Sequence, residues 1–281
     1  MCINHIDWEY DTFDIHVLNK TTKQQYQFNV EIPEHQKYWN QEIIYSYMED
    51  NELTIVTENN FDTDDDENYG TDVNHYTFDI NKEQLIEEEQ VYESVIEHSE
   101  NMHGDIAFHT SDHDKDHIII SKQQYRFENI EREDGEFIDE RESLVSSEVI
   151  RYNLQTKKLE EISLPKDIEK ATFMAFDEET YYFTDHSSPN IRIIPYEYKE
   201  EHVNEAWEVD VPQPEDSAWA NDAKLVNHKL YYLNEMYDGI HLPTTFVIDL
   251  QEEQLAFLGE LTVDKTDINT DNYHFEYLIV Q

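Results

Sequence analysis

Short runs of alternating apolar and polar residues recur along the whole chain and are separated by polar turns. In three segments, which begin at Tyr76, Ile150 and Phe246, an alternating strand leads to an Asp or Asn, a polar turn and a Leu that opens a second strand. Looser copies span Phe13–Val30 and Arg192–Val209. Alternation on both sides of a turn is typical of a β-hairpin, and an Asp or Asn side chain can bond backbone amides within the turn. The pattern predicts five hairpins.

A second pair of strands precedes four of these hairpins. The pairs are Glu42–Tyr47 with Leu53–Thr57, Asp105–Thr110 with His117–Ser121, Ala171–Phe176 with Thr180–Thr184, and Ala223–Val226 with Lys229–Asn234. The hairpins recur every 40 to 70 residues or so, which brackets the roughly 40–50 residues of a four-stranded propeller blade. The longest interval contains an insertion at Asn129–Ser143. Each pair and its hairpin are therefore interpreted as one blade, with the pair innermost.

The two ends of the chain each carry one unpaired strand. The first hairpin is preceded only by Asn4–Tyr10, and the chain ends in Tyr273–Val280. Pairing these two strands would complete a fifth blade and remove two exposed sheet edges. We therefore predict an all-β fold, a single β-propeller domain over residues 1–281 whose ring is closed by the N- and C-terminal strands. Five blades are the leading interpretation, and six follow if the insertion hides strands; a β-sandwich or a β-helix would show the same alternation.

The repeated segments resemble the blades of β-propeller repeat proteins, of the loose kind related to WD-repeat and quinoprotein-like propellers. The resemblance covers nearly the whole chain, although no Trp-Asp dipeptide and no kelch-type double glycine is present. It implies that the loops joining blades and the loops between the second and third strands share one face, around a central channel. These loops are His35–Asn40, Asn59–Asp72, Glu93–Gly104, Phe127–Ser147, Pro165–Lys170, Asp185–Asn190, Pro212–Trp219 and Asn234–Pro243.

Aromatic residues in these loops are the main candidates for ligand binding. Aromatic side chains in loops often form binding platforms, and packing beneath the loops is the alternative explanation. The predicted binding residues are Trp39, Tyr69, Trp219, Tyr237, Asp238 and His241.

The charge of the chain restricts its partners. Acidic residues number 65 and basic residues 19, for a formal net charge of −46. Such a chain repels phosphate backbones and anionic lipids, which argues against nucleic acid and membrane surfaces as partners. A carboxylate-rich surface suits solubility in a saline or alkaline exterior, so an extracellular or cell-surface location is expected. The same charge would attract cations or a basic partner, and we expect a monomer that binds a protein or carbohydrate.

Two segments invite a metal-binding interpretation. Asp62, Asp64 and Asp66 alternate like the start of an EF-hand loop, but Glu67 replaces the glycine and Val73 the bidentate acid. Calcium is the cofactor that this loop would bind. Asp112–Asp116 surrounds His113 and is flanked by His109 and His117, a spacing that can ligate zinc, nickel or copper. Because this second segment falls in a turn on the opposite face, it is interpreted as a solvated turn.

No catalytic residue is predicted. Ala218–Asp222 is similar to the nucleophile motif of invertase-type propellers, but that motif continues with Pro-Asn-Gly where this chain has Ala223-Lys224-Leu225. No Gly-x-Ser-x-Gly elbow and no glycine-rich phosphate loop occurs. The leading hypothesis is a non-catalytic binding module with an acidic face. The alternative is a carbohydrate-active hydrolase that uses channel carboxylates.

The lone cysteine and the hydropathy of the chain give two further limits. Cys2 is the only cysteine, so an internal disulfide and a thiolate zinc site are excluded. In a processed form, Cys2 could carry a lipid. No apolar run approaches the roughly 18 residues that a membrane-spanning helix needs.

Overall fold

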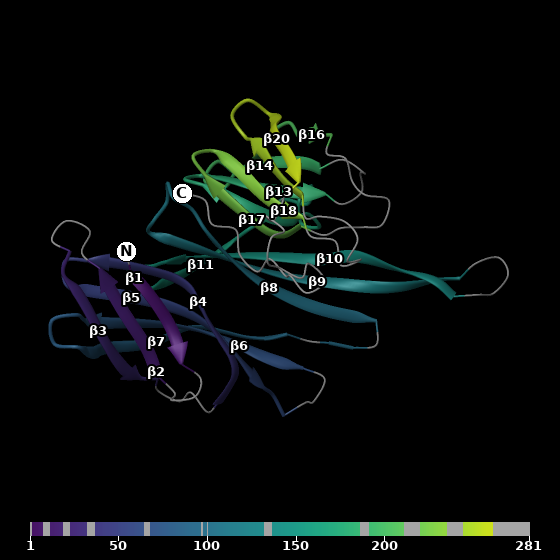
Figure 1. Cartoon of the computed structure of the whole chain (residues 1–281). Coiled ribbons are helices and arrows are strands. Elements are labelled where there is room, and N and C mark those ends of the chain that lie inside the picture. Colours follow the sequence, from purple (N-terminus) through teal and green to yellow (C-terminus); the bar gives the residue numbers. More distant parts are fainter. Residues whose placement is uncertain are drawn as a thin grey trace, which may run out of the picture. The chain divides into compact units, whose positions relative to one another are not determined.

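The computed structural model describes residues 2–7, 12–18, 23–32, 37–64, 68–96, 98–99, 101–131, 137–185, 191–210, 220–234 and 244–260. These residues form five β-sheets (Figure 1). The first sheet contains β1 (Cys2–Asp7), β2 (Thr12–Leu18) and β3 (Gln25–Glu31). The second contains β4 (Tyr38–Glu49), β5 (Glu52–Asp62), β6 (Tyr69–Asp79) and β7 (Gln84–Ile96). The third contains β8 (Met102–Thr110), β9 (His117–Glu131), β10 (Phe137–Asn153) and β11 (Lys158–Ile162).

The last two sheets follow the same plan. The fourth contains β12 (Thr172–Asp177), β13 (Thr180–Asp185) and β14 (Ile191–Glu197), and β14 pairs with both β15 (His202–Val203) and β16 (Trp207–Val209). The fifth contains β17 (Ala220–Val226), β18 (Lys229–Asn234), β19 (Thr244–Asp249) and β20 (Gln254–Glu260). Apart from β16, which pairs with β14 rather than with β15, the strands of each sheet follow in chain order, which is the meander of a propeller blade. The predicted all-β fold with five propeller sheets is confirmed.

Closure of the ring stays a prediction. β1 pairs with β2 in the first sheet, over the register from Cys2–Val17 to Asp7–Thr12. The strand Tyr273–Val280, which was expected to pair with it, lies outside the described residues.

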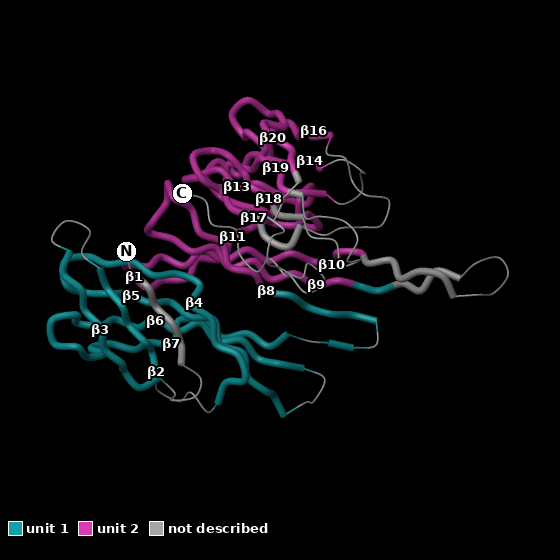
Figure 2. Tube along the Cα trace, in the orientation of Figure 1, with its two compact units in different colours: residues 1–105, 126–141 teal, residues 106–125, 142–281 magenta. Residues whose placement is uncertain are grey.

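The chain divides into two compact units, which are coloured separately in Figure 2. Unit 1 comprises residues 1–105 and 126–141, and unit 2 comprises residues 106–125 and 142–281. β8, β9 and β10 each contribute residues to both units. The single domain predicted for residues 1–281 stays a prediction, and each unit is described by itself.

The turn residues of the repeated hairpins behave as the sequence predicts. Oδ1 of Asp79 accepts hydrogen bonds from the backbone amides of Asn81 and Lys82, each at 3.0 Å. Oδ1 of Asn153 and Oδ1 of Asp249 each accept the equivalent pair of bonds, at 2.7–3.1 Å. The repeat therefore encodes the same side-chain-capped turn three times.

Each of these three turns also contains a residue with positive φ: Glu83 (54°), Lys157 (55°) and Glu253 (52°). For a residue with a Cβ atom the left-handed conformation costs about 1–2 kcal/mol, whereas glycine adopts it freely. We expect Glu253→Gly to give a free energy of unfolding about 1 kcal/mol higher than Glu253→Ala. Urea denaturation of the two variants measures this difference, and equal stabilities would contradict it.

Buried aromatic and branched residues form the core of each unit. In unit 1, Phe13 packs edge to face against Tyr76 and Phe78, with ring centroids 5.1 and 5.5 Å apart. In unit 2, Phe183 makes the same kind of contact with Phe173 at 5.4 Å and with Tyr196 at 6.4 Å. Such contacts stabilise aromatic pairs beyond the effect of burial alone.

Several strands run further into the loops of the predicted functional face than the sequence predicts. β5 extends to Asp62 and β6 begins at Tyr69, so the predicted loop Asn59–Asp72 is largely strand. β9 reaches Glu131 and β10 begins at Phe137, so the insertion lengthens a hairpin. The backbone ladder needs no apolar side chains, and cross-strand polar pairs such as Thr71 Oγ1 to Asn60 Oδ1 (2.6 Å) occupy these positions. Among the described residues, no helix is long and apolar enough to cross a bilayer.

Candidate functional site

The structure brings together two of the predicted binding residues. Trp39 and Tyr69 are in edge-to-face contact in unit 1, with ring centroids 5.8 Å apart and an interplanar angle of 72°. The other four predicted residues, Trp219, Tyr237, Asp238 and His241, lie outside the described residues. Trp39 is 55% exposed, so its side chain is accessible to a ligand.

Three further rings continue this contact and complete what we call the aromatic row: Trp39, Tyr69, His98, His103 and Phe127. Tyr69 stacks on His98 at 5.3 Å, and His98 lies parallel to His103 at 6.4 Å. His103 stacks on Phe127 at 4.6 Å with an interplanar angle of 17°. All five residues belong to unit 1, and they come from β4, β6, β8, β9 and the segment after β7.

A β-bulge places Trp39 in the row. In the pairing of β4 with β5, Tyr38 lies opposite Phe61 and Asn40 lies opposite Asn60, so Trp39 has no partner residue. A bulge of this kind adds one residue to a strand and redirects its side chain. The exposure of Trp39 therefore results from the local register of β4.

A buried carboxylate anchors the segment that leads into Trp39. Asp72 Oδ2 accepts hydrogen bonds from Lys37 Nζ (2.7 Å) and Tyr38 Oη (3.0 Å), and Oδ1 accepts one from Gln90 Nε2 (2.8 Å). The Asp72 side chain is fully buried, and a buried charge is stable only when it is paired and hydrogen-bonded. Burial also raises the pKa of Tyr38, so its hydroxyl remains a donor. Lys37 and Tyr38, the two residues before Trp39, thus both donate hydrogen bonds to the carboxylate of Asp72.

The middle of the row is fixed by backbone contacts. The amide of His98 donates a hydrogen bond to Asn68 Oδ1 at 2.8 Å. Thr63 Oγ1 donates to the backbone carbonyl of Asn68 at 3.0 Å, across the turn between β5 and β6. These bonds hold His98 beside Tyr69, the residue that follows Asn68.

Carboxylates lie beside the row on the same sheet. Side chains of alternate residues share a face of a strand, so Glu58, Asn60 and Asp62 of β5 lie on one face, and Tyr69 is directly opposite Asp62. Glu42 of β4 is directly opposite Glu58.

The environment makes Glu58 an unusually weak acid. Burial raises the pKa of Glu58 to about 7, and the charges of Glu42 and Asp105 add to this effect. The hydrogen bond from Asn60 Nδ2 to Glu58 Oε1 (3.4 Å) opposes it. Burial, with the charges of Asp105 and Glu58, also raises the pKa of Tyr69. The aromatic row therefore lies close to negative charge. That charge grows as the pH rises through neutrality and Glu58 loses its proton.

The predicted calcium site remains a prediction. Asp62 is the last residue of β5 and Asp64 lies in the following turn, and both are exposed. Asp66 lies outside the described residues. In the part of the chain that is described, neither Asp62 nor Asp64 belongs to a group of three residues close enough to share an ion.

The Asp112–Asp116 turn is the predicted solvated turn only in part: Lys115 and Asp116 are exposed, whereas Asp114 and the adjoining His117 are mostly buried. Asp114 Oδ1 and His117 Nδ1 are 2.6 Å apart, and their side chains are only 11% and 16% exposed. Sequence reasoning missed this because the contacts of Asp114 include Arg151, which lies 37 residues away. His109 lies apart from this pair, against Phe173, and burial lowers its pKa to about 4.

Sequence reasoning also missed His98, His103 and Phe127. All three fall in the loops Glu93–Gly104 and Phe127–Ser147, which were assigned to the functional face. His241 was the only histidine counted among the candidate binding residues of that face, although the rings of His98 and His103 stack like that of Tyr69. Counting ring-bearing residues of every type in these loops would have found them. Asp222, which was set aside as a nucleophile, lies in β17.

Among known proteins, the chain is similar to several solved structures. No family model matches the sequence. No curated protein matches it either. The chain is similar to the β-propeller domain of the Trilobed protease from Pyrococcus furiosus, with 14% identity, a TM-score of 0.43 and coverage of 94% of this chain and 67% of that chain.

Two enzymes are also among the similar structures. An oligogalacturonate lyase in complex with manganese has 9% identity and a TM-score of 0.41, with coverage of 96% of this chain and 67% of that chain. A puromycin hydrolase has 8% identity and a TM-score of 0.37, with coverage of 92% of this chain and 44% of that chain. The chain thus spans less than half the length of the puromycin hydrolase and about two thirds of the lyase.

Proposed function

We propose that this chain is a non-catalytic binding module whose aromatic row binds a positively charged segment of a partner protein. The observation that carries the proposal is the exposed ring of Trp39 in contact with Tyr69, beside the carboxylates of Glu58 and Asp62. A cation over an aromatic face gains about 0.5–2 kcal/mol, most over tryptophan. Lysine and arginine side chains combine such a cation with an apolar stem that can lie along the rings.

The charge of the whole chain supports a basic ligand. With a formal net charge of −46, the protein attracts cations over a distance set by the salt concentration. The aromatic row adds specificity, because rings that stack on one another are held in place before the ligand arrives. A rigid platform loses little conformational entropy on binding.

The test is titration of the full chain with an arginine-rich peptide, followed by fluorescence anisotropy. We expect Trp39→Ala and Tyr69→Ala to weaken binding about tenfold each, as for aromatic residues at the centre of an interface. Phe257→Ala is the matched control, because Phe257 is equally exposed at 53% and lies in unit 2. Equal affinity of the Trp39→Ala and Phe257→Ala variants would show that the peptide binds through net charge alone, and would refute the proposal.

Binding should also depend on pH near neutrality. Because the pKa of Glu58 is raised to about 7, this residue is largely protonated below that pH and gains its negative charge as the pH rises through it. We therefore expect affinity for the basic peptide to increase between about pH 6 and pH 8. In Glu58→Gln, which cannot ionise, this increase should disappear. A pH profile that is the same in both proteins would contradict the assignment.

One observation favours a carbohydrate-active hydrolase as the second candidate. A carboxyl group with a pKa near 7 can serve as a general acid, and Glu58 is close enough to Glu42 and Asp105 to feel both charges. Release of reducing sugar from a panel of polysaccharides tests this. Turnover by the wild-type chain that is lost in Glu58→Gln would replace the binding-module proposal by an enzyme.

A further inference from the structure

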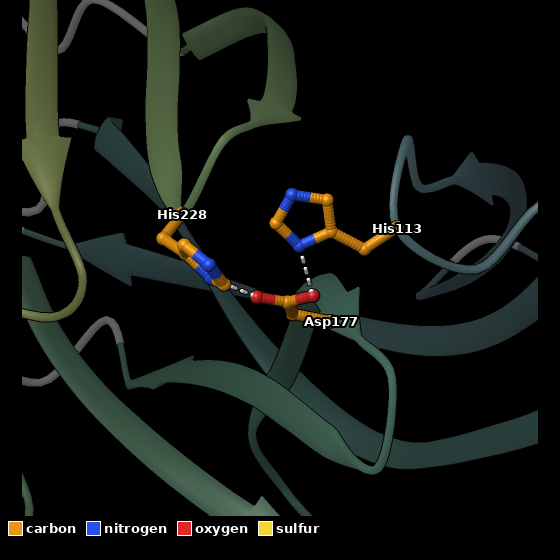
Figure 3. Close-up of side chains that lie close together, drawn as sticks. All are labelled: His113, Asp177 and His228. Carbon is orange, nitrogen blue, oxygen red and sulfur yellow. Dashed lines mark hydrogen bonds and ion pairs between the residues drawn. The ribbon is translucent and has the colours of Figure 1, made fainter.

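Three hairpin turns of unit 2 bring two histidines and one aspartate together (Figure 3). His113 lies in the turn between β8 and β9, Asp177 ends β12, and His228 lies in the turn between β17 and β18. In each of the three sheets this turn joins the first two strands, so equivalent positions of different sheets converge. One potential ligand atom from each residue lies within 4.8 Å of the other two.

The carboxylate of Asp177 bridges the two imidazole rings. Oδ1 lies 2.9 Å from His113 Nδ1, and Oδ2 is hydrogen-bonded to His228 Nδ1. The rings meet edge to face with centroids 4.4 Å apart. Both Nδ1 atoms therefore point at the same carboxylate.

We propose that His113, Asp177 and His228 form a binding site for a divalent transition-metal ion of the zinc class. Two imidazole nitrogens with one carboxylate oxygen suit zinc, nickel or copper, whereas calcium and magnesium prefer oxygen ligands only. In a tetrahedral site with bonds of about 2.0–2.2 Å, ligand atoms are separated by about 3.3–3.6 Å. The three ligand atoms all lie within 4.8 Å of one another, which is close to that spacing.

The three side chains differ in exposure in a way that would leave a bound ion accessible to solvent. Asp177 is 8% exposed and lies at the base of the group, whereas the side chains of His113 and His228 are 25% and 37% exposed. The carboxylate is thus held in place while the histidines form the rim. Three protein ligands leave a fourth coordination position open, as in zinc sites that exchange a water or bind a further ligand.

The backbone holds the two histidines next to each other. Asn227 and His228 both have positive φ, at 50° and 60°, which is the conformation of a two-residue turn that glycine usually occupies after asparagine. A histidine in that place keeps a strained conformation and supplies a ring that glycine lacks, as at functional positions. The amide of Asn227 donates a hydrogen bond to Asp112 Oδ2 at 3.2 Å, so the turn of His228 is bonded to the turn of His113.

The site is separate from the proposed function, because every residue of the aromatic row belongs to unit 1. Its test is calorimetric titration of the chelator-treated full chain with zinc chloride. The buffer contains an excess of calcium and magnesium, so that these ions rather than zinc occupy the many surface carboxylates. We expect one zinc ion to bind with micromolar or tighter affinity. Asp177→Asn, His113→Gln and His228→Gln should each weaken this binding at least tenfold, and the double variant His113→Gln with His228→Gln should abolish it.

The control is His202→Gln, which removes an exposed histidine of β15 and should leave zinc binding unchanged. Circular dichroism and the Tm of each metal-free variant show whether it is folded. Zinc should raise the Tm of the wild-type chain but not that of the double variant, because a ligand stabilises only the state that binds it. Absence of zinc binding by the wild-type chain, or equal binding by the folded double variant, would overturn the assignment.

Discussion

Asp72→Ala is expected to lower the free energy of unfolding by about 2–4 kcal/mol, because it removes a fully buried carboxylate that accepts three hydrogen bonds and leaves the buried Tyr38 hydroxyl without this acceptor. Lys37, Tyr38 and Gln90 would each lose the acceptor that now binds them at 2.7–3.0 Å. The buried Tyr38 hydroxyl would need a new partner, whereas the Lys37 amine, on a side chain that is 38% exposed, can turn to water.

The same substitution should weaken ligand binding by the aromatic row. Lys37 and Tyr38 directly precede Trp39, so loss of their anchor frees the bulge that presents this ring. Asp72→Asn is the informative comparison, because it keeps the shape of the side chain and one hydrogen-bond acceptor but removes the charge. Urea unfolding and peptide titration measure the two effects on the same samples.

Asp64→Ala is the matched control for Asp72→Ala. Asp64 is an exposed acid of the same unit, so its loss should change the free energy of unfolding by no more than about 0.5 kcal/mol. If Asp72→Ala is no more destabilising than Asp64→Ala, the buried carboxylate does not anchor β4.

Arg151→Leu should be the second strongly destabilising change, with a loss of about 2–4 kcal/mol. Arg151 Nη2 lies 3.1 Å from Asp114 Oδ2, and the two side chains are only 14% and 11% exposed. Nη1 is hydrogen-bonded to the hydroxyl of Tyr198, and the guanidinium lies over the Tyr198 ring. Leucine fills the space but leaves the Asp114 carboxylate with one bond fewer.

Arg192→Leu provides the comparison for Arg151→Leu within unit 2. Arg192 pairs with Asp185 at the same distance of 3.1 Å, but the two side chains are 40% and 33% exposed. An exposed pair of this kind contributes about 0–1 kcal/mol. Similar losses for the two variants would show that burial does not strengthen the Arg151 pair. Because Asp114 follows His113 in the same turn, Arg151→Leu should also weaken zinc binding several-fold while Arg192→Leu should not.

The strands and turns of the fold could be predicted closely from the sequence. The repeated Asp or Asn of the hairpins does cap its turn at Asp79, Asn153 and Asp249. These bonds join residues two or three positions apart, so their signal is local. Strand ends in acidic segments were missed, because hydrophobic alternation fades there while the backbone ladder continues, as at Glu58–Asp62 of β5.

Less of the candidate site could be predicted. Trp39 and Tyr69 were recognised as loop aromatics, but their contact depends on a bulge in β4 that no local pattern marks. The stacking of His98 on Tyr69 and of His103 on Phe127 brings together residues more than twenty positions apart in the chain, on or next to paired strands of the same sheet. Such contacts need the pairing of whole strands, which a linear pattern specifies only in part.

By itself, the sequence determined the all-β class, the repeated hairpins, their capped turns and a charge that favours basic partners. The tertiary structure alone decided which turns meet: His113 and His228 reach the carboxylate of Asp177 from 64 and 51 residues away. The physical reason is one of range. Alternation and turn chemistry act over a few residues, whereas the convergence of distant turns follows from the twist and packing of complete sheets.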